Sequence, residues 1–372
     1  MSQELEQTAA QRAKEAVQLD RQGSRAAAIA KYQQAIQLLY KLLELTDDDK
    51  IRAVYWEKIK QYQSRTEQLK SAKQVEEPLQ QGKARFDELV VTEKPKVTWQ
   101  DVVGLEAAKK AIRDSIIFPH RRPDLYPLGW PRGILLFGPP GCGKTLLAAA
   151  VANEIEAYFY YVDAASVMSK WLGESEKNVA NLFYSARESC KDGHPAIIFI
   201  DEVDSLTAVR QVEVGGEARA RNQLLKEMDG LTEKGRNEHL YVLAATNKPW
   251  DLDEPFVRRF QKRIYVPLPD RASRLDMFKQ YISHLRVDES VSLEVLADAT
   301  PNYSGHDIHD ICMEAQMKVV RELFESGQTG PGTKPRPITM DDLLEIIRTR
   351  RSSISMETIA KIESWSKMHM AL

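Results

Sequence analysis

The most specific chemical signal in the sequence is a glycine-rich loop that ends in a lysine and a threonine. It reads Gly138-Pro139-Pro140-Gly141-Cys142-Gly143-Lys144-Thr145 and fits the phosphate-binding pattern G-x-x-x-x-G-K-[ST]. Glycines in such a loop let backbone N–H groups face phosphates, and the N-terminus of the following helix adds positive potential. We predict that Lys144 reaches the β and γ phosphates of a nucleotide and that Thr145 coordinates Mg²⁺. Cys142, inside the loop, is interpreted as filler rather than as a redox control.

A pair of carboxylates ends a strongly apolar run further along the chain. Asp201 and Glu202 follow Ile197-Ile198-Phe199-Ile200. We expect Asp201 to hold the Mg²⁺ through water and Glu202 to orient and polarise the attacking water. Acidic residues are common in turns after strands, so this pair indicates chemistry only together with the phosphate loop. Asn247, which ends another apolar run, carries an amide that we expect to position the same water.

Two adjacent arginines, Arg258 and Arg259, lie outside these loops. One interpretation is an ordinary ion-paired surface dipeptide. The other is an arginine finger that reaches the γ-phosphate held by a neighbouring subunit, where such a group raises the rate by about 10³–10⁵. The pattern of residues leaves both interpretations open.

A large aromatic side chain lies beside a lysine in the turn Lys170-Trp171-Leu172-Gly173-Glu174-Ser175. A tryptophan is usually part of a core, because its burial is strongly stabilising. Here polar residues surround Trp171 between two helical patterns, which favours a loop that faces solvent.

These residues need a scaffold, and from Trp99 onward short apolar runs alternate with helical patterns. The runs predicted as buried strands are Gly133–Phe137, Ala157–Val162, Ala196–Ile200, Leu240–Ala244 and Lys262–Val266. Helical patterns lie between them, for example over 144–156 and 176–190, which indicates a parallel sheet covered on both faces. After Pro269 we predict helices over 271–284, 293–299 and 305–325, then a Gly/Pro loop over 327–337 and two closing helices.

The first 75 residues differ from the rest in being rich in Ala, Gln, Leu and Lys. Apolar residues at Ile29, Tyr32, Ile36, Leu39 and Leu43 step by three and four, which is one stripe of a helix. Thinner stripes before and after it predict three antiparallel helices. So small a bundle serves either packing and oligomerisation or the docking of a partner's peptide in a groove.

The chain therefore divides into five predicted parts. They are a three-helix bundle (1–75), a linker (76–96), a large α/β domain (97–268), a small helical domain (269–345) and a C-terminal helix (346–372). The linker lies within the segment 73–97, which contains Pro78, Gly82 and Pro95 and in which five basic and five acidic residues cancel.

Composition excludes several classes of protein. The 372 residues are 43% hydrophobic and 28% charged, which is typical of globular proteins rather than of disordered, collagen-like or coiled-coil chains. The longest apolar stretch, 146–152, is far shorter than the roughly 20 residues of a membrane span. The N-terminal residues show no basic n-region before an apolar core, so no secretory signal is indicated. The three cysteines are few and odd in number, which argues against a disulfide framework. We expect a cytoplasmic protein, and the net charge of −2 argues against nucleic acid as a partner.

Together, the phosphate loop, the Asp201-Glu202 pair, Asn247 and the two arginines resemble the AAA ATPases. The segment 101–105 resembles the loop that covers adenine in that family, 170–175 is similar to its first pore loop, and the N-terminal bundle resembles an MIT domain. Within the family the likeness is greatest to the ATPases that disassemble ESCRT-III filaments, in particular the archaeal cell-division members, and segment 121–131 carries the archaeal character.

The resemblance implies a nucleotide site for ATP or ADP with Mg²⁺. The catalytic residues would be Lys144, Glu202 and Asn247, with Arg258 and Arg259 supplied by a neighbour, and the metal residues Thr145 and Asp201. Gly305 and His306 fall where many wider AAA+ proteins have a sensing arginine, which this subgroup lacks, and are interpreted as adenine-side contacts. The implied nucleotide contacts are Asp101, Val103, Gly104, Pro140, Gly141, Cys142, Gly143, Lys144, Thr145, Leu146, Gly305 and His306.

The resemblance also implies a homo-oligomeric ring, typically a hexamer. Lys170, Trp171 and Leu172 would grip an extended polypeptide in its pore, and the MIT bundle would catch ESCRT-III-like (CdvB-type) subunits, so that membrane association is indirect. The predicted function is an ATP-driven ring that remodels such filaments in archaeal cell division. Only eleven residues, 327–337, stand where eukaryotic relatives carry a β-rich insertion that binds an activator, which argues against such a partner.

Two other functions are weighed against this one. A microtubule-severing or general unfolding ATPase would share the motifs, but severing relatives tend to have basic linkers, whereas the segment 73–97 of this chain is neutral. A nucleotide-gated scaffold that binds without hydrolysing is disfavoured, because Glu202, Asn247 and both arginines are present.

Overall fold

The computed structural model describes residues 2–21, 25–46, 49–71, 96–164, 175–191, 193–207, 215–233, 239–327, 330 and 332–369. The chain forms two units, Met1–Gly82 and Lys83–Leu372. None of the helices in the described ranges is both long enough and apolar enough to cross a membrane.

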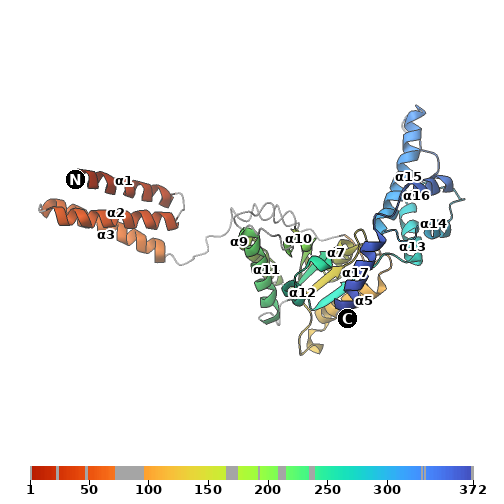
Figure 1. Cartoon of the computed structure of the whole chain (residues 1–372), viewed down its shortest axis with the longest axis horizontal. Coiled ribbons are helices and arrows are strands. Elements are labelled where there is room, and N and C mark those ends of the chain that lie inside the picture. The colour runs from red at the N-terminus through yellow and green to blue at the C-terminus, as the bar shows by residue number, and fades with distance from the viewer. Residues whose placement is uncertain are drawn as a thin grey trace. The chain divides into compact units, whose positions relative to one another are not determined.

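The first unit is a bundle of three helices, α1 (Ser2–Arg21), α2 (Arg25–Leu45) and α3 (Asp49–Ser71) (Figure 1). From the predicted stripe, Tyr32, Leu39 and Leu43 are buried in α2, where Leu42 joins them. Alanines on α1 and aromatic and aliphatic residues on α3 complete the core, so α2 is packed by both of its neighbours. The prediction of three helices in this region is confirmed.

The second unit is built on a five-stranded parallel sheet with the order β2-β3-β4-β1-β5. The strands are β1 (Gly133–Phe137), β2 (Tyr158–Asp163), β3 (Ala196–Asp201), β4 (Leu240–Thr246) and β5 (Lys262–Tyr265). Every residue of β1 and β4 is buried, as expected for central strands covered on both faces. All five predicted strands are present, each with its ends within two residues of the prediction.

Alternate residues of each strand face two different hydrophobic layers. Ile134 and Leu136 of β1 pack with α5 (Glu106–Ile112), the π-helical turn Arg113–Ile117 and α7 (Lys144–Glu154). Leu135 and Phe137 face the other side. The helices on that side are α9 (Ser175–Cys190), α11 (Gly215–Glu233), α12 (Glu254–Arg259) and α17 (Met356–His369). Short helical segments at α6 (Phe118–Arg121), Pro123–Leu125, α10 (Asp204–Thr207) and Pro249–Asp251 complete this domain.

A smaller helical domain follows the sheet, with its own core. It consists of α13 (Arg271–Ile282), α14 (Leu293–Ala299), α15 (Gly305–Glu325) and α16 (Met340–Thr349). No strand follows Pro269 in the described ranges apart from an isolated bridge between Val287 and Ile338. The last helix, α17, leaves this domain and lies against the sheet, where Ile362 and Trp365 are buried (Figure 1).

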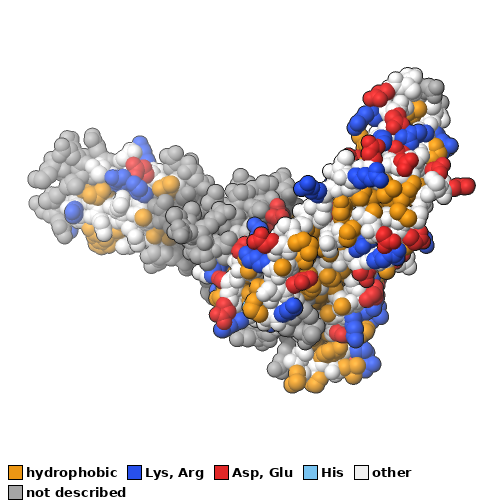
Figure 2. Space-filling view, turned by 45° about the vertical axis from the view of Figure 1, so that its right-hand side comes forward, with side chains coloured by type: hydrophobic (Ala, Val, Ile, Leu, Met, Phe, Trp, Pro, Cys, Tyr) orange, Lys and Arg blue, Asp and Glu red, His pale blue; other side chains and the backbone are white. Residues whose placement is uncertain are grey.

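The face of the molecule shown in Figure 2 mixes acidic and basic side chains over the helical domain, with hydrophobic side chains between them. In this view (Figure 2) acidic and basic side chains lie among one another and do not gather into a patch of one sign.

Candidate nucleotide site

The glycine-rich loop connects β1 to α7 and lies against two other segments. A Cβ atom at Gly138 would lie 2.0 Å from the carbonyl oxygen of Val266, and one at Gly141 (φ +70°) would lie 2.8 Å from Ser304 Oγ. Only glycine fits where the loop backbone passes so close to its neighbours. The loop is thus wedged between the end of the sheet and the start of α15.

Lys144 and Asn247 meet at the carboxyl end of the sheet. The ammonium group of Lys144 donates to the carbonyl oxygens of Gly138 (3.0 Å) and Pro139 (2.8 Å) and to Asn247 Oδ1 (2.6 Å). Burial lowers the pKa of Lys144 to about 8, because the charged form loses solvation there. These three acceptors hold the ammonium group over the loop, where an anionic ligand would meet it.

Thr145 and Asp201 also meet, as the sequence predicts. Thr145 Oγ1 donates to Asp201 Oδ2 at 2.8 Å, and the backbone N–H of Glu202 donates to Asp201 Oδ1 at 3.0 Å. A hydroxyl and a carboxylate are hard oxygen ligands of the kind that Mg²⁺ prefers, so the residues present fit this ion.

Glu202 itself adopts a left-handed backbone conformation (φ +50°), and its residue is exposed. A non-glycine residue in this region is uncommon and stores backbone strain, which is found most often at functional sites. The turn is fixed by Ser205, whose backbone N–H and hydroxyl both donate to the Glu202 carbonyl oxygen. The strained turn therefore presents the Glu202 carboxylate to solvent directly after β3.

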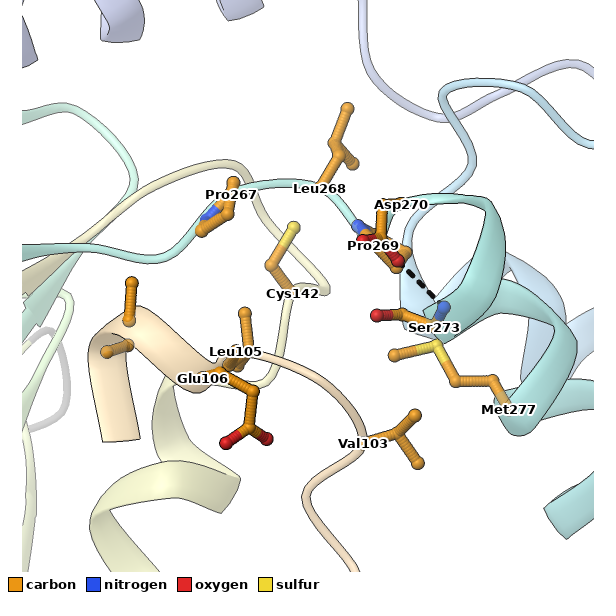
Figure 3. Close-up of a pocket in the computed structure, with 12 residues that line it drawn as sticks. Val103, Leu105, Glu106, Cys142, Pro267, Leu268, Pro269, Asp270, Ser273 and Met277 are labelled. Atoms are coloured by element: carbon orange, nitrogen blue, oxygen red, sulfur yellow. Dashed lines mark hydrogen bonds between the residues drawn. The ribbon is translucent and has the colours of Figure 1, made fainter. Parts of the chain in front are cut away.

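A cavity of about 200 Å³ lies beside the loop, between the segment that precedes α5 and the start of α13 (Figure 3). Val103, Leu105 and Cys142 line it together with Ser273 and Met277 of α13 (Figure 3). The lining is mostly apolar, which suits a flat aromatic ring better than a phosphate. Burial raises the pKa of the Cys142 thiol to about 12, so this residue packs as an inert apolar group.

The remaining residues predicted to contact the nucleotide are placed differently around this cavity. Gly104 presses its backbone against α13, since a Cβ there would lie 2.3 Å from Ser273 Oγ. The backbone N–H of His306 donates to Gly141 O (3.2 Å), and a Cβ added at Gly305 would lie 3.5 Å from the Met277 side chain. Pro140 is exposed in the loop, and Leu146 of α7 is 39% exposed.

Asp101 does not line the cavity. Its carboxylate accepts hydrogen bonds from the Thr98 backbone N–H (2.7 Å) and Thr98 Oγ1 (2.8 Å), and these bonds lower its pKa. In this structure Asp101 closes a turn that precedes the cavity wall.

Sequence reasoning missed one wall of the cavity. This wall runs from the end of β5 into α13 and includes Pro267, Leu268, Pro269, Asp270, Ser273 and Met277. The only local signal there is the cap of α13, where Asp270 Oδ1 accepts from Ser273 N at 2.8 Å. That signal predicts a helix start and says nothing about a ligand.

The two arginines lie at the end of α12, near the amino-terminal end of β1 rather than near its carboxyl end, where the phosphate loop begins. A Cβ on Gly133, at the start of β1, would lie 2.5 Å from Arg259 O, whereas the phosphate loop follows the end of the same strand. Five residues of strand span about 17 Å, more than an arginine side chain reaches. Arg258 pairs with Glu254, and Arg259 pairs with Asp229 at 2.6 and 2.7 Å. Neither arginine reaches the loop of its own chain.

The predicted pore residues Lys170, Trp171 and Leu172 lie outside the described residues. Of the predicted set, the structure brings together Lys144 with Asn247, Thr145 with Asp201, and Gly141 with His306.

Three segments of the chain match known protein families. Residues 134–268 match the ATPase family associated with various cellular activities (AAA), residues 6–71 the MIT (microtubule interacting and transport) domain, and residues 290–330 the AAA+ lid domain. The chain belongs to the AAA ATPases, with an MIT domain in front of the ATPase core and a lid behind it.

Similarity to Cell division protein C of Sulfolobus acidocaldarius extends over the whole chain, with 49% identity across 99% of this chain and 98% of that protein. Vacuolar protein sorting-associated protein 4A of Rattus norvegicus is 43% identical across 68% of this chain and 59% of its own length. The crystal structure of the FIGL-1 AAA domain in complex with ADP superimposes with a TM-score of 0.69 at 36% identity, over 78% of this chain and 98% of that one.

Proposed function

We propose that the chain hydrolyses ATP to ADP and phosphate in a Mg²⁺-dependent reaction. Mg²⁺, when bound, would neutralise charge that develops on the phosphates. Thr145 and Asp201 would hold it, because their oxygens already lie together at the carboxyl end of the sheet. Glu202 would take the proton of the attacking water as a general base, and Asn247 would orient that water.

In this proposal the nucleotide replaces contacts that Lys144 now makes within the chain. The ammonium group would exchange carbonyl acceptors of the loop for phosphate oxygens, while Gly141, Cys142, Gly143 and Leu146 surround the phosphates. The adenine would enter the apolar cavity between Val103 and Met277, bounded by Gly104, Pro140, Gly305 and His306. Asp101 would act indirectly, by holding the turn that leads into the cavity wall.

The position of the arginines supports a ring of identical subunits, for which we propose a hexamer. Arg258 and Arg259 lie a strand's length from the phosphate loop of their own chain, so they could complete a site only in a neighbouring one. Exposed Arg258, with 70% of its side chain accessible, is available for such a contact.

We further propose that this ring remodels ESCRT-III-like filaments during cell division. The observation that carries this proposal is the identity of 49% with Cell division protein C, which covers the MIT domain as well as the ATPase. The MIT bundle would bind the tails of CdvB-type subunits and recruit a cytoplasmic protein to the division site. Lys170, Trp171 and Leu172 would then grip the chain in the pore.

A disassembly assay tests the proposal. Filaments of an ESCRT-III-like subunit with an MIT-binding tail are mixed with the full chain, ATP and Mg²⁺, and polymer is measured by sedimentation. We expect loss of polymer that requires ATP hydrolysis and the subunit's tail. Phosphate release without any loss of polymer would contradict the filament function and leave the ATPase intact. Microtubules in place of filaments test the severing alternative.

A further inference from the structure

A second group of chemically active side chains lies at the start of α15, apart from the phosphate loop. His306, His309 and Asp310 stand at positions i, i+3 and i+4 of this helix, so their side chains share one face. Among the described residues they are the group of histidines, cysteines and carboxylates whose donor atoms all lie within 4.8 Å of one another. None of the chemistry proposed above uses His309 or Asp310.

The spacing of these atoms suits ligands around an ion better than hydrogen bonds. Asp310 places one carboxylate oxygen 3.7 Å from His306 Nε2 and the other 3.5 Å from His309 Nδ1. Both distances exceed the range of about 2.7–3.2 Å in which such groups hydrogen-bond. Zn²⁺ binds imidazole nitrogen and carboxylate oxygen at about 2.0–2.2 Å in a tetrahedron, which separates its ligands by about 3.4 Å.

The two imidazole rings are open to solvent, whereas the Asp310 carboxylate is largely buried. The rings of His309 and Tyr281 of α13 meet in a T-shaped pair, with centroids 5.2 Å apart, and the rings of His306 and His309 are nearly parallel. The Asp310 side chain is only 14% exposed, whereas those of His306 and His309 are 68% and 49% exposed. An ion could therefore enter without unfolding of the helix and keep water in its remaining positions.

One cation already competes for this carboxylate. The guanidinium group of Arg350, which follows α16, pairs with Asp310 and lies 3.4 Å from a carboxylate oxygen of Glu314. Arg350 holds Asp310 in place, but its positive charge opposes a second cation on the same group. This competition gives the test a direction: removal of the charge at position 350 should tighten metal binding.

We propose that His306, His309 and Asp310 form a binding site for a divalent transition-metal ion of the Zn²⁺ type on the lid domain. Two imidazole nitrogens and one carboxylate select such an ion over Mg²⁺ or Ca²⁺, which take oxygen ligands. The backbone N–H of His306 donates to Gly141 O in the phosphate loop, so an ion bound here would stiffen the joint between lid and loop.

Isothermal titration of the metal-free full chain with ZnCl₂, without nucleotide, tests the site. We expect His309→Ala, and independently His306→Gln, to weaken Zn²⁺ binding by about tenfold or more. His284→Ala is the matched control, because His284 is also an exposed histidine of the lid region, and it should bind as wild type does. Arg350→Met should bind Zn²⁺ more tightly.

Circular dichroism and ADP binding of the His309→Ala protein verify that it is folded. Absence of Zn²⁺ binding to the wild-type chain, or equal binding by wild type and His309→Ala, would overturn the proposal. A Zn²⁺ affinity unchanged by Arg350→Met would remove Asp310 from the ligand set. Titration with MgCl₂ should give no heat from this site, and binding of Mg²⁺ that depends on His309 would also contradict the assignment.

Discussion

At the scale of single residues, the site consists of contacts between the start of α7 and the residues at the ends of β3 and β4. Lys144 donates a hydrogen bond to Asn247, and Thr145 donates one to Asp201, although more than fifty residues separate the members of each pair. Parallel strands place their carboxyl ends at one edge, so residues that follow β1, β3 and β4 meet there.

The first prediction at this scale concerns the proposed general base. Glu202→Gln keeps the size of the side chain but removes the carboxylate, so we expect ATP binding to persist and turnover to fall by about 10²–10⁴-fold. Phosphate release and equilibrium binding of a fluorescent ATP analogue measure the two effects separately. Turnover at the wild-type rate would refute the role assigned to Glu202.

The second prediction concerns the wall of the cavity. Gly104→Ala would place a methyl group 2.3 Å from Ser273 Oγ, and the wall would have to shift. Gly129→Ala is the matched control, since Gly129 also has a positive φ (+84°) but no atom lies within 4 Å of its added Cβ. Backbone strain should lower the free energy of unfolding of both variants by about 1–2 kcal/mol. Only Gly104→Ala should weaken ADP binding; equal ADP affinities would show that this wall does not contact the nucleotide.

At the scale of elements, two imidazoles join α6 to the start of β4. The rings of His120 and His239 meet edge to face at 5.1 Å, and Trp130 stacks on His239 at 5.7 Å. Burial lowers the pKa of both histidines, with Arg121 adding to the effect at His120, and His120 and Arg132 at His239. Both rings are therefore neutral in the folded chain at neutral pH.

This pair makes stability depend on pH. A histidine in the unfolded chain is protonated near its ordinary pKa of 6.5. The two histidines in the folded chain have lower pKa values and are protonated only at lower pH. The unfolded state then binds more protons, so the free energy of unfolding falls as the pH drops below 6.5. Urea unfolding of the His120→Gln/His239→Gln chain between pH 5 and 8 should show a flatter pH dependence than wild type. The exposed control His284→Gln should retain the wild-type slope, and parallel slopes for all three would contradict the argument.

At the scale of the whole molecule, the arginines lie far from the phosphate loop of their own chain, so in the proposed ring the activity would depend on assembly. Arg259→Ala should bind nucleotide nearly as wild type does and hydrolyse it slowly, because the missing group belongs to a neighbour's site.

Mixing tests this directly. In an equal mixture of Arg259→Ala and Glu202→Gln chains, a site is intact when an Arg259→Ala subunit receives its arginine from a Glu202→Gln subunit, which random assembly gives for about one quarter of sites. Phosphate release by the mixture should therefore exceed that of either variant alone. No recovery at any ratio would argue against a shared site.

Features set by local rules could be predicted from the sequence alone. The phosphate loop needs glycines at fixed spacing, central strands need unbroken apolar runs, and α2 needs an apolar stripe with a helical period. Each of these patterns involves only residues that are close together in the sequence. The pairing of the loop with Asp201 and Asn247 also follows, because a parallel sheet brings strand ends together.

Other features were decided by packing between distant segments, which leaves no local pattern to read. Ser273 and Met277 line the cavity only because α13 folds back beside Val103. The rings of Trp365 of α17 and Phe137, the residue before the phosphate loop, have centroids 4.8 Å apart. Arg259 forms an ion pair with Asp229 of α11. Such contacts depend on how helices and strands pack in three dimensions, because a side chain's partner is chosen by the shape and charge of whatever surface the fold brings to it.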